Sequence, residues 1–121
     1  MGLLILIYIL IYFAPLIVGW AFMGIQKKIK FVHSESGINK NGFIGYSWTY
    51  FFFGFFVPIF RGEIGIGVLH LLLSLVTFGI FQLIMPFLYN KQYSTRLLTN
   101  GWKLNDNEML NNLAKTKLNL N

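Results

Sequence analysis

The run from Leu3 to Gly24 contains no charged side chain, and this feature limits most what the chain can fold into. At about 1.5 Å per residue, a helix over this run is long enough to cross a hydrocarbon core of roughly 30 Å. No basic segment precedes the run, and no small-x-small cleavage pattern follows it, so a cleaved signal peptide is not expected. The sequence therefore predicts a retained transmembrane helix here.

Two further apolar runs follow, at residues 43–60 and 64–88. Hydrophobic residues make up 55% of the 121 residues and charged residues only 12%, too few charges for the surface of a soluble domain. We therefore expect an all-α integral membrane protein with three transmembrane helices, over about residues 3–24, 43–60 and 64–88. The second run is at the lower edge of spanning length, so a re-entrant segment is its alternative.

The charged residues outside these runs predict the orientation. The loop at residues 26–42 is basic, and its cations are Lys27, Lys28, Lys30 and Lys40. The tail from residue 91 to 121 is also basic, so the positive-inside rule places both segments in the cytoplasm. This topology puts the N-terminus outside, the C-terminus inside, and the turn Arg61, Gly62 and Glu63 outside. A solvated Arg61–Glu63 ion pair is expected at that turn.

The Trp and Tyr residues agree with this orientation, because such side chains are enriched at membrane interfaces. The expected anchors on the cytoplasmic side are Trp20, Tyr46, Trp48, Tyr50, Tyr89, Tyr93 and Trp102. The chain is thus divided into an N-terminal helix (1–25), a basic loop (26–42), an aromatic-rich helical hairpin (43–90) and a tail (91–121).

Within the tail, residues 106–118 have the spacing of a short amphipathic helix, with Asn105 or Asp106 as its N-cap. Its apolar positions are Met109, Leu110, Leu113 and Leu118. The simpler interpretation is a helix on the bilayer or against the basic loop, and the alternative is a docking site for a protein partner at the cytoplasmic face.

Polar and small residues fall on one line along the third run. They are Glu63, Gly67, His70, Ser74 and Thr77. One hypothesis is that this stripe lines a water-filled path between protomers, with His70 as its titrating group. The other is that the stripe packs against another helix, with Tyr8 or Tyr12 bonded to His70 or Glu63.

Several chemistries are not indicated by the residues. The absence of cysteine excludes disulfides and thiolate sites, and His33 and His70 are too few to suggest a metal site. Glycine-rich phosphate loops and preorganised nucleophiles are not found, so no enzymatic activity, cofactor or metal is expected. The net charge of +6 is attributed to membrane-facing loops, so nucleic acid binding is not expected.

The stretch GYSWTYFFFGFFVP at residues 45–58 is followed by FRGE at residues 60–63, TFG at residues 77–79 and YNKQY at residues 89–93. With Leu97, Leu98 and Gly101, this order of motifs over about residues 42–102 resembles the HrgC-like family of small bacterial and phage-encoded membrane proteins. The resemblance implies a membrane hairpin module associated with mobile elements, in a bacterial inner membrane. The chain has Ile64 to Gly67 after the turn, where the family has more polar or aromatic residues.

Three functions follow as hypotheses. The resemblance implies a non-enzymatic membrane component of a phage or mobile element, acting in envelope modification, defence or superinfection exclusion. The alternatives are an oligomeric ion channel or membrane-permeabilising effector lined by the stripe from Glu63 to Thr77, and a membrane anchor that recruits a cytoplasmic partner. Oligomers of this chain are expected through the glycine-bearing faces of the first and third runs.

Overall fold

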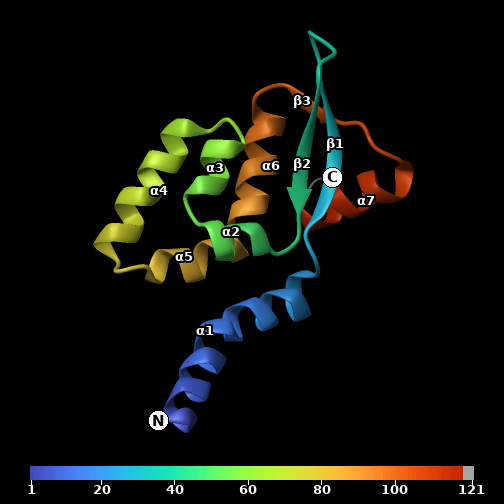
Figure 1. Cartoon of the computed structure of the whole chain (residues 1–121). Helices are drawn as coiled ribbons and strands as arrows, with labels where there is room; N and C mark the ends of the chain where they lie inside the picture. The colour runs from blue at the N-terminus through green and yellow to red at the C-terminus, as the bar shows by residue number, and fades with distance from the viewer. Residues whose placement is uncertain (119–121) are drawn as a thin grey trace.

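The fold is mixed α/β, as a computed structural model that describes residues 1–118 shows. A long N-terminal helix leads into a β-hairpin, which is followed by a lobe of short helices, a third strand and a C-terminal helix (Figure 1). The prediction of an all-α protein is therefore wrong. The basic loop at residues 26–42 is not a loop but the hairpin of a three-stranded antiparallel sheet.

Helix α1 spans Gly2–Met23 and matches the first predicted run. It contains Pro15 and ends at Gly24, whose positive φ of 80° turns the chain into the sheet. Most of its apolar side chains are exposed, and in Figure 1 the N-terminal half extends away from the other elements. Within residues 1–118, α1 is the one continuous helix long and apolar enough to cross a membrane.

The hairpin consists of β1 (Lys27–His33) and β2 (Asn39–Ile44), and β3 (Trp102–Leu104) pairs with the other edge of β1. Ile29 and Phe31 on β1 are buried, while Lys28 and Lys30, which alternate with them, are exposed. This alternation is the period of a strand with one buried face. The lysines make the segment basic and led to the prediction of a loop, although the apolar residues that alternate with them fit a strand.

The second and third predicted runs are interrupted helices. The second contains α2 (Trp48–Phe53) and α3 (Phe56–Phe60), with a break at Gly54, where φ is 57°. The third contains α4 (Ile64–Val76), α5 (Ile80–Ile84) and the 3₁₀ helix η1 (Met85–Phe87). The α4 axis and the following helical segment meet at 118°.

Three transmembrane helices are therefore not present. The longest helix in these two runs, α4, has 13 residues, or about 20 Å at the helical rise, against roughly 30 Å of hydrocarbon. Counted together as one bent span, α4 and the segment to Phe87 would raise the number of candidate spans to two. The multi-pass topology predicted from charge is not supported, because apolar composition over 25 residues does not require a straight helix.

Contacts across the predicted membrane also contradict that topology. The predicted topology puts Gln26 on the cytoplasmic side and Arg61 on the outer side, yet their side chains are hydrogen-bonded. It puts Glu63 outside and Arg96 inside, yet these two residues form an ion pair. The turn between α3 and α4 therefore lies on the same side of the molecule as the sheet and the helix that contains Arg96.

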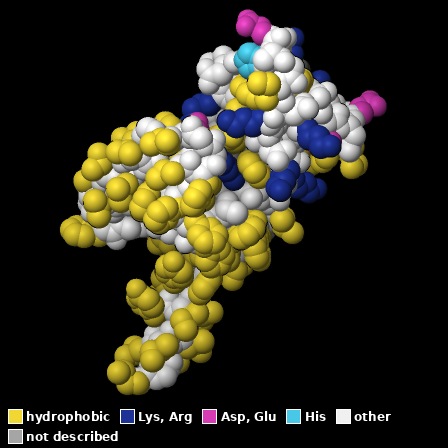
Figure 2. Space-filling model, turned by 45° about the horizontal axis from the view of Figure 1, so that its top comes forward, with side chains coloured by type: hydrophobic (Ala, Val, Ile, Leu, Met, Phe, Trp, Pro, Cys, Tyr) yellow, Lys and Arg dark blue, Asp and Glu magenta, His cyan; other side chains and the backbone are white. Residues whose placement is uncertain are grey.

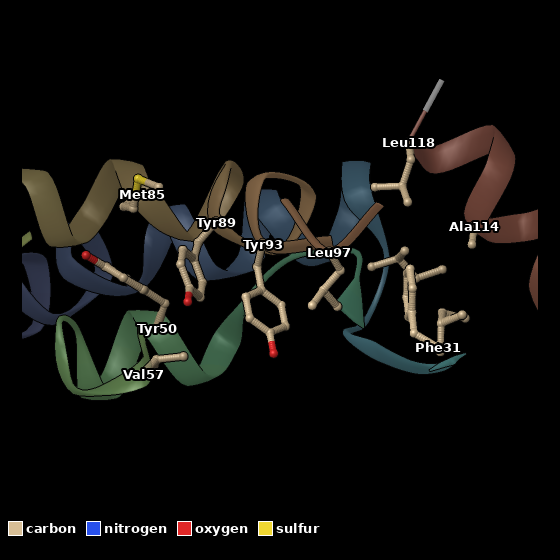
Figure 3. Packing of buried hydrophobic residues seen from close by; sticks show 11 residues of the cluster. Phe31, Tyr50, Val57, Met85, Tyr89, Tyr93, Leu97, Ala114 and Leu118 are labelled. Atoms are coloured by element: carbon tan, nitrogen blue, oxygen red, sulfur yellow. The ribbon is translucent and has the colours of Figure 1, made fainter. Parts of the chain in front are cut away.

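Helix α6 (Tyr89–Thr99) joins the helical lobe to the sheet. Tyr89, Tyr93 and Leu97 point to the same side of α6, toward Tyr50 near one end and Phe31 near the other (Figure 3). The buried Ser94 hydroxyl accepts a hydrogen bond from the Phe43 N–H at 3.0 Å and donates one to the Phe43 carbonyl at 2.5 Å. Ser94 thus provides hydrogen-bond partners for the backbone of Phe43 on β2, an edge strand of the sheet.

Helix α7 (Glu108–Lys117) corresponds to the predicted amphipathic tail helix. Its N-cap is Asn107, whose side chain accepts the Leu110 N–H at 2.8 Å, rather than Asn105 or Asp106. Ala114 and Leu118 pack into the same core as Phe31, so α7 covers one face of the sheet. Asp106 instead accepts a hydrogen bond from the Lys30 backbone, which fixes the loop before α7 on β1.

Candidate functional site

A bidentate ion pair links the start of α4 to α6. Arg96 donates from Nε to Oε2 of Glu63 at 2.6 Å and from Nη2 to Oε1 at 2.8 Å. The Tyr89 hydroxyl donates to the same Oε1 at 2.8 Å. Three donors on one carboxylate, two of them charged, make a stronger contact than a solvated surface pair. Glu63 therefore pairs with Arg96 rather than with Arg61, its neighbour in sequence.

The electrostatics of this pair favour its charged form. Burial by itself would raise the pKa of Glu63, but the hydrogen bonds from Arg96 and Tyr89 outweigh burial and hold that pKa below its ordinary value. The hydrogen bond to Glu63 raises the pKa of Arg96. Both groups are therefore ionised at neutral pH, and their charges cancel locally.

His70 lies next to this pair, inside the helical lobe. It is 5% exposed, and its Nδ1 shares a hydrogen bond of 2.9 Å with the Tyr50 hydroxyl. The rings of Phe81 and Tyr89 pack edge-on against the imidazole, with centroids at 5.0 and 5.9 Å. The histidine is therefore surrounded by aromatic rings within one chain.

Arg61, at the end of α3, has different surroundings from Arg96. Its Nη1 donates to the Asn90 side-chain oxygen at 3.0 Å, and its Nη2 donates to the Gln26 side-chain oxygen at 3.4 Å. The guanidinium lies over the Phe43 ring at 3.8 Å from the centroid, a cation–π contact. Burial lowers the pKa of Arg61, which nevertheless stays charged at neutral pH.

Gln26 is the centre of this second cluster. Its side-chain oxygen also accepts the Asn90 amide at 2.8 Å and the Thr49 hydroxyl at 3.3 Å. These contacts join the chain before β1 to α2, α3 and α6. Sequence reasoning missed Gln26, Asn90 and Phe43. Asn90 appeared only within the YNKQY motif, and no sequence signal pointed to Gln26 or Phe43, because their partners are far apart in the chain.

The predicted stripe is divided between the interior and the surface. Glu63 and His70 bond as described, and Gly67 faces Ile59, whose side chain occupies the space that a Cβ would need. Ser74 is half-buried, and the Thr77 hydroxyl donates to the Leu73 carbonyl of its own helix at 2.8 Å. The tyrosines that contact Glu63 and His70 are Tyr89 and Tyr50.

Tyr8 and Tyr12, which the packing hypothesis assigned to those contacts, lie on α1. Tyr8 is exposed, and the ring of Tyr12 packs against Phe51 on α2.

The aromatic residues expected as membrane-interface anchors differ in how exposed they are. Tyr46, Tyr50, Tyr89 and Tyr93 are buried core residues, whereas Trp20 and Trp48 are exposed. Trp102 on β3 is half-buried, with the Lys40 ammonium 5.8 Å from its ring centroid. The other lysines of the hairpin, Lys27, Lys28 and Lys30, project from β1 and are exposed.

No group of three or more metal-ligating side chains occurs within residues 1–118. The ring Nδ1 of His33 accepts the backbone N–H groups of Glu35 and Ser36 at 3.3 Å each, which fixes the hairpin turn. His33 and His70 lie in different parts of the fold, in β1 and α4. The described residues thus offer polar clusters that hold elements together, and a groove beside Arg61.

That groove has a volume of about 440 Å³ and lies between the sheet and helices α2 and α3. Arg61 and Lys28 supply its positive charge, and Trp48, Phe53 and Phe60 are among its apolar wall. Phe53 and Phe60 are also part of the exposed apolar surface of the helical lobe. The groove is thus basic at one part of its wall and mostly apolar elsewhere, with Gln26 and Thr49 as its neutral polar residues.

Comparisons with protein-family profiles, curated proteins and solved structures find no match to this chain. The resemblance to the HrgC-like family therefore stays a prediction from the motifs.

Proposed function

We propose that the protein is a membrane-bound component with a structural rather than catalytic role. Helix α1 anchors it, the helical lobe α2–α5 enters one leaflet, and the sheet with α7 lies at the anionic lipid surface. The observation that carries this proposal is the separation of apolar from charged side chains over the molecule (Figure 2).

The separation follows the secondary structure, and the charged residues within the lobe are Arg61 and Glu63 in the turn between α3 and α4. None of the 14 charged residues lies in α1, α2, α3, α4, α5 or η1. These helices expose large apolar side chains, and Phe78 at the bend between α4 and α5 is 96% exposed. Burying one such side chain contributes about 1.5–3 kcal/mol, so a surface of many of them favours lipid over water.

The bend at the end of the lobe has a backbone suited to a tight reversal. Phe78 and Gly79 both have positive φ, of 55° and 87°. A bulky residue rarely adopts this conformation, yet here it directs Phe78 away from the protein. Leu75, Val76 and Ile80 beside it are also exposed, so the large exposed side chains at the tip of the lobe are apolar. An apolar tip supports insertion of the lobe.

Insertion of the tip can be measured directly, because the chain has no cysteine to interfere with labelling. An environment-sensitive fluorophore is attached to Phe78→Cys, and liposomes containing anionic lipid are added. We expect a blue shift of its emission and quenching by brominated acyl chains. Ile38→Cys is the matched control, because Ile38 is also an exposed apolar residue but lies at the hairpin turn. An aqueous emission at position 78 in protein that floats with liposomes would refute insertion of the lobe.

The other roles stay predictions. The association with a phage or mobile element rests on the resemblance alone, and so does a role in envelope modification or exclusion. The pore hypothesis and the expected oligomers require contacts between chains. Recruitment of a cytoplasmic partner would use the sheet and α7, the half of the molecule that this proposal places outside the hydrocarbon.

A further inference from the structure

The groove beside Arg61 has both cationic and apolar side chains in its wall, and a membrane lipid likewise has a polar headgroup and apolar chains. The side chains of Lys28 and Arg61 are cationic, while Trp48, Phe53 and Phe60 supply apolar wall. Phe60 is 82% exposed and adjoins Arg61 in the chain, so a molecule in the groove could touch the cation and the apolar lobe together.

Arg61 carries a positive charge that no ion pair neutralises within residues 1–118. The one ion pair there joins Arg96 to Glu63, and the partners of Arg61 are the neutral side chains of Asn90 and Gln26. These bonds use two of the five guanidinium N–H donors. The Glu63 carboxylate favours the charged form of Arg61 from a distance but is itself bonded to Arg96 and Tyr89. The half-buried guanidinium therefore has no anion in contact with it, and because burying a charge is costly it favours an anion beside it.

We propose that this groove binds a net anionic phospholipid, with its phosphate at Arg61 and Lys28 and an acyl chain along Trp48, Phe53 and Phe60. This inference rests on the proposed function, because it requires the lobe to lie in a leaflet.

The geometry fits this occupant better than a peptide or a soluble anion. Guanidinium is suited to phosphate because its planar donors match the phosphate oxygens. The groove borders Phe53 and Phe60 of the membrane-facing surface, so acyl chains reach it from the bilayer. Each cation at a membrane surface attracts anionic lipid by about 1 kcal/mol, which corresponds to about fivefold enrichment per cation.

Trp48 lines the groove and can report its occupant. In a Trp20→Phe, Trp102→Phe background, Trp48 is the single tryptophan, and the substitutions keep an aromatic ring at both other positions. The protein is placed in phosphatidylcholine liposomes that contain a small equal fraction of either brominated phosphatidylglycerol or phosphatidylcholine with the same brominated chains. We expect Trp48 to be quenched more by the phosphatidylglycerol, as if that lipid were several-fold enriched at the groove.

Two charge variants and one control locate the lipid. Arg61→Gln and Lys28→Gln are each expected to lower the enrichment about fivefold. Lys28 is exposed, so its substitution remains informative if Arg61→Gln unfolds the protein. Lys27→Gln is the control, because it removes the same charge from the adjacent residue of β1, which lines a different pocket. It is expected to lower the excess quenching of Trp48 much less than either groove variant, because the Lys27 charge attracts anionic lipid to the surface but not to the groove.

The outcomes separate this inference from the proposed function. Equal quenching by the two lipids, in protein that floats with the liposomes, would overturn the lipid site and leave membrane binding intact. Failure to float would refute membrane binding and the lipid site with it. Inorganic phosphate, added to the protein in detergent, is expected not to change Trp48 fluorescence, because it has no acyl chain. A saturable response to phosphate alone would overturn the assignment to a lipid.

Discussion

The carboxylate of Glu63 and the guanidinium of Arg96 are joined by two hydrogen bonds, of 2.6 and 2.8 Å, across 33 residues of sequence. The pair closes the part of the helical lobe that α4, α5 and η1 form, because Glu63 precedes α4 and Arg96 lies on α6. The residues from Ile64 to Leu88 are free of charge and belong to the lobe that we place in the membrane.

Breaking this pair should destabilise the fold. Glu63→Gln and Arg96→Gln each leave a charge without its partner. We expect each substitution to lower the free energy of unfolding by about 2 kcal/mol, the size expected for hydrogen bonds to charged groups. The double substitution removes both charges and should cost less than the sum. Thermal unfolding in a mild detergent measures these differences. Additive effects would show that the two side chains are not coupled.

The same pair predicts a loss of stability in acid. The pKa of Glu63 is below its ordinary value in the folded protein, so its contribution is complete above the unfolded pKa of about 4.5. The contribution is lost as the pH falls through the lower folded value. Stability measured between pH 6 and pH 3, in steps of roughly one unit, should therefore fall more steeply in the parent than in Glu63→Gln. Equal slopes would contradict the assigned role of the carboxylate.

The hydrogen bond between Tyr50 and His70 predicts a third effect. Tyr50→Phe keeps the ring but leaves the buried imidazole without its partner, at a cost of about 1–3 kcal/mol. Tyr8→Phe removes a hydroxyl from an exposed tyrosine on α1 and should leave stability unchanged. Thermal unfolding of the two variants under one set of conditions makes the comparison. Equal stability of both would mean that the hydroxyl of Tyr50 does not support His70.

The position of the α3–α4 turn can be tested by labelling. Ser36→Cys marks the hairpin turn and Gly62→Cys marks the turn before α4, where the positive φ adds about 1–2 kcal/mol of strain. In sealed vesicles of uniform orientation, both should react with a membrane-impermeant maleimide from the same side. Reaction from opposite sides would restore a crossing between them and refute the fold described for this region.

Retention of α1 gives a fifth prediction. An N-terminal apolar helix passes the same test of length and composition whether it anchors a protein or is a signal sequence. Gly19 on α1 packs against the buried Tyr46 ring, and Leu16 belongs to the same cluster, so α1 is part of the fold. Intact-mass analysis of these 121 residues, expressed by themselves and extracted from membranes, should give 14.0 kDa. A mass lower by that of about the first 24 residues would show that α1 is cleaved off.

The sequence by itself determined the apolar character of the chain, the helix at α1 and the helix at α7. These properties are local, because a long uncharged run and helical spacing are visible in consecutive residues. The sequence also indicated the turn from Arg61 to Glu63, and it marked Glu63 and His70 as polar residues at and within an apolar run. It did not determine their partners, since Tyr50, Tyr89 and Arg96 are distant in the chain.

Tertiary structure decided the rest. The alternation of Ile29 and Phe31 with lysines became a strand only because β2 and β3 supply its hydrogen-bonding partners. The two long apolar runs became short helices because Gly54 and the pair Phe78–Gly79 adopt positive φ, a choice that composition does not reveal. Apolar content reports which solvent a segment prefers, but the path of the backbone depends on turns and on contacts between distant residues. Those contacts placed Arg61 beside Gln26, where charge counting had put a membrane between them.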